Sequence, residues 1–126
     1  MSTYQCDKVI EGVKCCLIHS LYQIDKDRVI VGGTDLFYIV NIDKCVIEKK
    51  IKDESLGNVR CFLKLRNNKT ILCGCDNGIF CFYDMITKEY KITEYNHKYG
   101  IFDLLLIDDS TFLSSSADNT IKVWKY

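Results

Sequence analysis

Short runs of apolar residues, separated by polar turns, recur along the whole chain. Residues 59–65 are largely apolar, a turn at 66–69 follows, and two further apolar runs at 70–75 and 79–85 flank an Asp-Asn-Gly turn. Runs of this length, rich in Ile, Val, Phe and Tyr and broken by Asn, Asp and Gly, predict β-strands joined by hairpins. None of the runs is long enough, or suitably periodic, for a stable helix. The pattern therefore predicts an all-β protein built from antiparallel meanders.

The same pattern occurs three times, in the segments 23–35, 64–76 and 106–118. Each segment reads as an apolar residue, a polar turn, an apolar strand, small residues and then an aspartate. Positions recur at a nearly constant step of about 42 residues, and self-similarity at such a period is the mark of a repeat architecture. Three sets of residues are thereby predicted to correspond: Ile24, Leu65 and Ile107; Val31, Leu72 and Leu113; Asp35, Asp76 and Asp118.

The strands of one repeat differ in polarity. "LFYIVNI" (36–42) and "IFCFYDM" (79–85) are apolar at nearly every residue, which indicates strands covered on both faces. "CVIEKKI" (45–51) and "EYKITEY" (89–95) include charges, as expected of an outer strand near solvent. Small four-stranded sheets of this kind, stacked around an axis, are the blades of a β-propeller. A two-sheet sandwich would show a cleaner alternation on every strand, and it is the less favoured architecture.

The segment "SSSADNTIKVW" (114–124) holds the only tryptophan of the chain. With His97 four residues before Ile101, the third repeat resembles the WD-repeat family of β-propellers. The resemblance implies a structural hydrogen-bond chain of His97, Asp118, Trp124 and a serine, either Ser114 or Ser116. It also implies that Asp35 and Asp76 are the corresponding turn aspartates and that Phe82 takes the Trp position of the second repeat.

The repeat also predicts where the blades lie. "TYQCDKV" (3–9) stands one repeat length before 45–51 and is expected to be an outer strand. Blade one is then expected at 17–51, blade two at 59–95, and blade three at 101–126 without an outer strand of its own. Three blades are too few for a ring, because propellers have about four to eight. Two resolutions are open: two chains form a six-bladed ring in which each N-terminal strand completes the partner's last blade, or the chain is part of a larger propeller or a shortened gene product.

Composition narrows the range of partners. Seventeen basic and seventeen acidic residues give no net charge, whereas a nucleic acid or an anionic membrane surface favours a basic excess. The first residues lack the apolar core of a signal peptide, and no apolar run approaches the roughly 18 residues that span a bilayer. We therefore expect a cytoplasmic protein, with the nucleus left open, whose eight cysteines are reduced thiols.

The cysteines provide the main alternative function, a metal-binding or thiol-redox protein. Strand alternation places Cys73 and Cys75 on one face, with Cys61 and Cys81 on neighbouring strands. No paired C-x-x-C motif is present and both histidines are distant in sequence, so cysteine as a small apolar filler is the favoured interpretation. No cofactor, metal or catalytic motif is expected, and the serines at 114–116 are interpreted as strand residues.

The resemblance implies a non-catalytic docking platform that holds proteins or peptides within a larger assembly. Function on such scaffolds lies in the loops and strand ends that a rigid framework presents. Arg60, in register with Ile18 and Phe102 one repeat length to either side, is a candidate contact at one end of the blades. Arg60 and Phe102 are therefore candidate residues for binding the partner, and a solvated surface charge is the alternative interpretation of Arg60.

Overall fold

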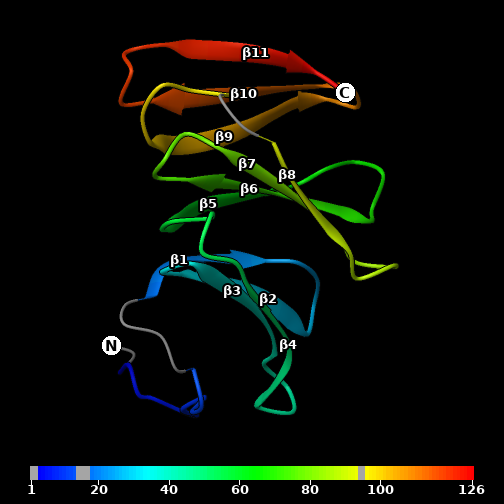
Figure 1. Ribbon diagram of the computed structural model, residues 1–126. Coiled ribbons are helices and arrows are strands. Elements are labelled where there is room, and N and C mark those ends of the chain that lie inside the picture. The colour runs from blue at the N-terminus through cyan, green and yellow to red at the C-terminus, as the bar shows by residue number, and fades with distance from the viewer. Residues whose placement is uncertain (1–2, 14–17, 94–95) are drawn as a thin grey trace.

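The computed structural model describes residues 3–13, 18–93 and 96–126, which form three antiparallel sheets that follow one another along an open arc (Figure 1). Each sheet is a meander in which consecutive strands pair. Blade one contains β1 (Ile18–Gln23), β2 (Arg28–Gly33), β3 (Leu36–Asn41) and β4 (Val46–Lys52). Blade two contains β5 (Val59–Lys64), β6 (Thr70–Cys75), β7 (Phe80–Asp84) and β8 (Tyr90–Thr93). Blade three contains β9 (Ile101–Asp108), β10 (Thr111–Ser116) and β11 (Ile121–Lys125). The described residues contain no helix that is long and apolar enough to cross a membrane.

The blades stack because strand alternation gives each sheet two apolar faces. We call the face toward the following blade the forward face and the opposite one the backward face. In blade one, Ile30 lies on the forward face and packs against blade two, whereas Val29 and Val31 lie on the backward face. Blade two is buried on both sides, which explains why its strands β6 and β7 are apolar at nearly every position.

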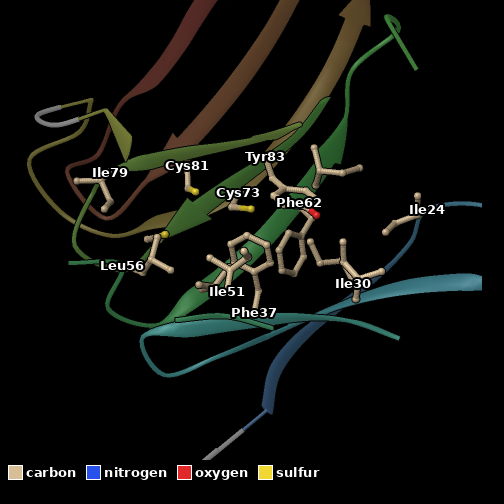
Figure 2. Close-up of a cluster of buried hydrophobic side chains, with 14 residues drawn as sticks. Ile24, Ile30, Phe37, Ile51, Leu56, Phe62, Cys73, Ile79, Cys81 and Tyr83 are labelled. Carbon is tan, nitrogen blue, oxygen red and sulfur yellow. The ribbon is translucent and has the colours of Figure 1, made fainter. Parts of the chain in front are cut away.

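Two clusters of buried side chains hold the three blades together. The first joins blade one to blade two, where Phe37 packs edge-on against Tyr83 with ring centroids 5.5 Å apart (Figure 2). The second joins blade two to blade three, where Phe80 packs edge-on against Trp124 at 5.2 Å and against Phe112 at 5.7 Å. Aromatic pairs of this geometry add to the stability that burial alone supplies.

Two glycines set the distance between neighbouring blades. A Cβ atom on Gly32 would lie 2.5 Å from the carbonyl oxygen of Val59, which belongs to the first strand of blade two. A Cβ atom on Gly74 would likewise lie 2.8 Å from Ile101 Cγ2 in the first strand of blade three. Both glycines occupy the same place in their blades, and each lets the next inner strand approach closely.

The N-terminal segment differs from the sequence-based expectation. Residues 3–9 were expected to form an outer strand, but residues 3–13 have no regular secondary structure. The sheet that lacks a fourth strand is blade three, and its free edge on β11 lies at the opposite end of the arc from this segment (Figure 1). Ile10 and Val13 instead pack onto the backward face of blade one. The expected boundaries at residues 17 and 95 lie outside the described residues.

One predicted correspondence is also wrong by one residue. Val31 lies on the backward face of blade one, whereas Leu72 lies on the forward face of blade two. Strand pairing shows that Cys73 corresponds to Val31, since Leu21 pairs with Val31 and Phe62 pairs with Cys73. The turn between the first two strands spans 24–27 in blade one but 65–69 in blade two, and this extra residue shifts the register. A one-residue shift moves a side chain to the other face of the sheet.

The packing predicts a large effect at Phe80, which is 1% exposed. We expect Phe80→Ala to lower the free energy of unfolding by about 3–5 kcal/mol, because it removes a buried ring and leaves a cavity between blades two and three. Phe102→Ala is the matched control; its ring is 63% exposed, and we expect a change within about 0.5 kcal/mol. Urea unfolding followed by circular dichroism measures both, and equal losses in the two variants would contradict the assigned core.

Candidate functional site

The polar centre of blade three is a hydrogen-bond chain that runs from strand β11 to the β10–β11 turn. Trp124 donates from Nε1 to Ser114 Oγ at 2.8 Å, and Ser114 Oγ also contacts His97 Nε2. His97 Nδ1 lies 2.8 Å from Asp118 Oδ2. The imidazole then carries its proton on Nδ1, and Ser114 donates to Nε2, so that every buried polar atom along this chain has a partner. Only 3% of His97 is exposed.

The structure thus brings together His97, Ser114, Asp118 and Trp124, but it places Ser116 elsewhere. Ser116 Oγ donates to the carbonyl oxygen of Tyr99 at 3.0 Å and accepts from the backbone N–H of Asp118 at 3.1 Å. Ser114 is therefore the serine of the chain, and Ser116 fixes the turn that carries Asp118. Both side chains are buried and hydrogen-bonded, so neither has the exposed geometry of a nucleophile.

Asp118 is held in its ionised form by several donors. The Thr120 hydroxyl and the His97 ring lower the pKa of Asp118 well below its usual value, although burial opposes them. The backbone N–H groups of Lys98 and Thr120 also donate to this carboxylate, at 3.1 and 2.9 Å. Thr120 was not predicted from the sequence, although a hydroxyl two residues after a turn aspartate is a recognisable signal.

The three aspartates predicted to be equivalent occupy different positions. The backbone N–H of Cys75 donates to the carbonyl oxygen of Ile79, and the N–H of Ser116 donates to that of Thr120. The two turns therefore align, and Asn77, not Asp76, corresponds to Asp118. Asp76 instead accepts from the backbone N–H and the side-chain amide of Asn58, at 2.9 and 2.6 Å.

Asp35 lies in a two-residue turn, where its φ is 60°. The turns of blades two and three span four residues, so equal spacing in the sequence does not give equal places in the blades.

The Trp position of blade two is also shifted by one residue. Tyr83 pairs with Ile71 as Trp124 pairs with Phe112, and both aromatic rings lie on the backward face. Phe82, which was predicted at this position, points to the forward face. Blades one and two therefore depend on apolar packing where blade three has its hydrogen-bond chain.

A bulge at the start of the first strand occurs in every blade. Pairing shifts between Ile18 and Ser20, between Val59 and Cys61, and opposite Ser115 and Ser116, so that one residue of each blade is unpaired. Bulges of this kind redirect a side chain and are frequent beside functional sites. The bulged residues are His19, Arg60 and Phe102.

Arg60 and Phe102 therefore do occupy equivalent places, as expected, but their counterpart in blade one is His19 rather than Ile18. The sequence-based alignment assumed equal spacing between repeats. The bulged residues of blades one and two are one residue closer in sequence than those of blades two and three, so the alignment selected Ile18 instead of His19. Arg60 and Phe102 are exposed and His19 is half-buried, and their strands β1, β5 and β9 are neighbours. They form a row along one edge of the three blades, at the start of the first strands, which we call the bulge row.

The loops beside the bulge row are tied to the turns that precede the third strands. Asp35 N–H donates to the carbonyl oxygen of Gly57 at 2.7 Å, and Ala117 N–H donates to that of Gly100 at 2.9 Å. These bonds, together with the Asn58–Asp76 contacts, hold the bulge row on a fixed framework. A groove of about 650 Å³ opens near these loops, between blades two and three; it is lined by Ser55, Asn77, Ile79, Ile92, His97, Lys98 and Lys122.

The cysteines of blade two lie on both faces of their sheet. Cys73, Cys75 and Cys81 are buried between blades one and two, and Cys73 pairs directly opposite Cys81. Cys61 packs on the other side, toward blade three, so the four thiols do not converge. Burial raises the pKa of Cys61 to about 12 and raises that of Cys73 and Cys75 as well. Within the described part of the chain, no three His, Cys, Asp or Glu residues are grouped as metal ligands.

Comparison with known proteins now adds to this geometry. The model of the family "WD domain, G-beta repeat" matches residues 89–125, which carry the hydrogen-bond chain of blade three. The third repeat of the chain is therefore a WD repeat. It is 33% identical over 101 residues to WD repeat-containing protein 55 of Arabidopsis thaliana, a match that covers 77% of this chain and 28% of that protein.

Two solved structures have the same fold. The WD40 repeats of RRP9 superpose with a TM-score of 0.80 at 17% identity, over 94% of this chain and 38% of that one. The computationally designed protein Ika4 superposes with a TM-score of 0.70 at 18% identity, over 86% of this chain and 65% of that one. The WD-repeat chain described here thus has propeller blades, arranged as open sheets rather than as a closed ring.

The lowered pKa of Asp118 predicts a dependence of stability on pH. Because the carboxylate ionises more readily in the folded state than in the unfolded state, its contribution is complete above the unfolded pKa of about 4 and is lost as pH falls below it. We expect Asp118→Asn to lower the melting temperature at pH 7 and to flatten its decline between pH 5 and pH 2. Melting curves followed by circular dichroism across this range provide the measurement, and parallel curves for the variant and the parent would contradict the assignment.

Burial also predicts which thiols react. At pH 8, we expect iodoacetamide to modify exposed Cys6 at least tenfold faster than Cys73 or Cys75, because burial hides these two thiols and raises their pKa, and only the thiolate is nucleophilic. Peptide mass spectrometry at several times measures the rates, and urea should abolish the difference. Fast modification of Cys73 in the folded protein, or zinc near one equivalent by elemental analysis, would favour the alternative thiol or metal function.

Proposed function

We propose that this chain acts as a docking scaffold for a protein or peptide partner within a larger assembly, and that the partner binds over the bulge row. WD repeats are in general protein-interaction scaffolds, and the family is typically non-enzymatic. The observation that supports this site is the bulge common to all three blades, which presents His19, Arg60 and Phe102 on three neighbouring strands.

The chemistry of the bulge row favours a partner with both a carboxylate and an apolar group. Among the described residues, no carboxylate lies within salt-bridge distance of Arg60, so its guanidinium is available to an external acceptor. Phe102 offers an exposed ring on the neighbouring strand. Arginine beside an aromatic residue is a frequent combination at the energetic centre of protein interfaces.

The framework around the bulge row supports binding without rearrangement. The hydrogen-bond chain of blade three fixes the β10–β11 turn, and Asn58 with Asp76 fixes the loop before β5. A rigid surface loses little conformational entropy when a partner binds.

We further propose a cytoplasmic location, with the nucleus left open. The scaffold would work as a completed ring, whose further blades come from a second copy or from the rest of a larger propeller.

The proposal predicts the effect of truncating the bulge row. We expect Arg60→Ala and Phe102→Ala each to weaken partner binding at least tenfold, with melting temperatures within a few degrees of the parent protein. Quantitative affinity purification from the source cells identifies co-purifying proteins, and titration with the main one gives the affinities. Arg66→Ala is the matched control, because Arg66 is an exposed arginine on the β5–β6 turn whose guanidinium lies 3.4 Å from the Asp109 carboxylate. Equal binding by all three variants would exclude the bulge row as the site.

A further inference from the structure

Each end of the arc exposes an apolar sheet face: the backward face of blade one at one end and the forward face of blade three at the other. At one end, the backward face of blade one carries a hollow of about 280 Å³ whose walls include Ile18, Leu21, Val29, Val31, Val40 and Ile42. At the other end, the forward face of blade three exposes Leu105, Ile121 and Val123, the last two being 72% and 64% exposed. Contiguous exposed apolar surface of this kind marks an interaction site or a risk of aggregation.

The contacts within the chain show what fits each open face. Both internal interfaces pack a forward face of one blade onto the backward face of the next. The forward face of blade three and the backward face of blade one are therefore the two types of face that pack together inside the chain. One chain cannot join them, because the two faces lie at opposite ends of its arc (Figure 1).

A missing strand accompanies the open faces. Blades one and two have four strands each, whereas blade three ends at β11 with an unpaired edge. Residues 3–9 stand one repeat length before 45–51, most of which form the fourth strand of blade one, and they match that strand in their mixture of apolar and charged positions. In this structure they are exposed and pair with no strand, and Tyr4 is almost fully accessible. Residues 3–9 are thus an unpaired segment with the pattern of a fourth strand, and β11 has an open edge with which such a strand can pair.

We propose that two copies of this chain close head to tail into a six-bladed ring, in which residues 3–9 of each copy pair with β11 of the other. The forward face of each blade three then packs on the backward face of the other copy's blade one, as blades pack within the chain. Ile10 and Val13, which cover part of that backward face here, move aside when residues 3–9 join the other copy.

A second copy is the occupant that the geometry favours. Each copy has one forward and one backward open face, so two copies cover all four faces and give each blade three the fourth strand that blades one and two have. Six blades also lie within the range of about four to eight that rings of this type use. This inference is independent of the bulge row, whose residues lie at the end of the inner strands rather than on β11 or on residues 3–9.

The test measures the mass of the 126-residue chain in solution by light scattering on a sizing column, from about 1 to 100 µM. We expect a species of twice 14.6 kDa at the higher concentrations. Val123→Asp places a charge on the open forward face and should raise the dissociation constant at least tenfold, and Gln5→Pro should do the same because it blocks strand pairing. Ile86→Asp is the matched control; Ile86 is 74% exposed in the β7–β8 turn, and we expect an unchanged dimer.

Hydrogen exchange locates the contact and separates it from other dimers. We expect the backbone amides of residues 3–9 and of β11 to be protected in the dimer and to lose protection in Gln5→Pro. The melting temperature should rise with concentration in the parent protein but not in Val123→Asp, whose monomer remains folded because the residue is exposed. A folded monomer at all concentrations, open-ended assemblies larger than a dimer, or a dimer without protection at residues 3–9 would each overturn the proposal.

Discussion

The structure depends on the burial of both faces of a small sheet. A four-stranded meander with two apolar faces is not stable alone in water, and blade two becomes stable because blade one covers one face and blade three the other. Gly32 and Gly74 make this possible, since each lets the inner strand of the next blade approach closely. The spacing of the blades, the row of bulged residues and the open faces at the ends all follow from this stacking.

The blades achieve rigidity in two ways. Blade three places a hydrogen-bond chain from Trp124 to Asp118 in the interface with blade two, where every polar atom of the chain has a partner. Blade two fills the corresponding space with Tyr83, Cys73 and other apolar side chains. The hydrogen-bond chain and the apolar side chains each fill the space between two neighbouring blades. The backbones of the blades are therefore similar, although the His, Asp and Trp residues of the chain occur together only in the third repeat. The family model accordingly matches residues 89–125, which carry this motif.

Sequence reasoning identified the strands, because hydrophobic periodicity and turn residues are local signals. The resemblance to WD repeats indicated His97, Asp118 and Trp124, and left the serine open between Ser114 and Ser116. Sequence reasoning assigned several equivalent positions wrongly by one residue, as at Asp76 and Phe82. Turn lengths vary among the blades, and a fixed repeat length cannot show at which turn a residue has been inserted. The place of His19 beside Arg60 was missed for the same reason, since bulges have no clear sequence signature.

The sequence by itself determined that the chain forms short antiparallel strands in three repeated units, which follows from the apolar period and the turn residues. The resemblance of the third unit to WD repeats implied the hydrogen-bond chain that includes His97, Asp118 and Trp124. The tertiary structure decided which face each side chain occupies, how the thiols divide between two interfaces and where residues 3–9 lie. Those outcomes depend on strand register and on contacts between blades, and neither is encoded in any single segment of the chain.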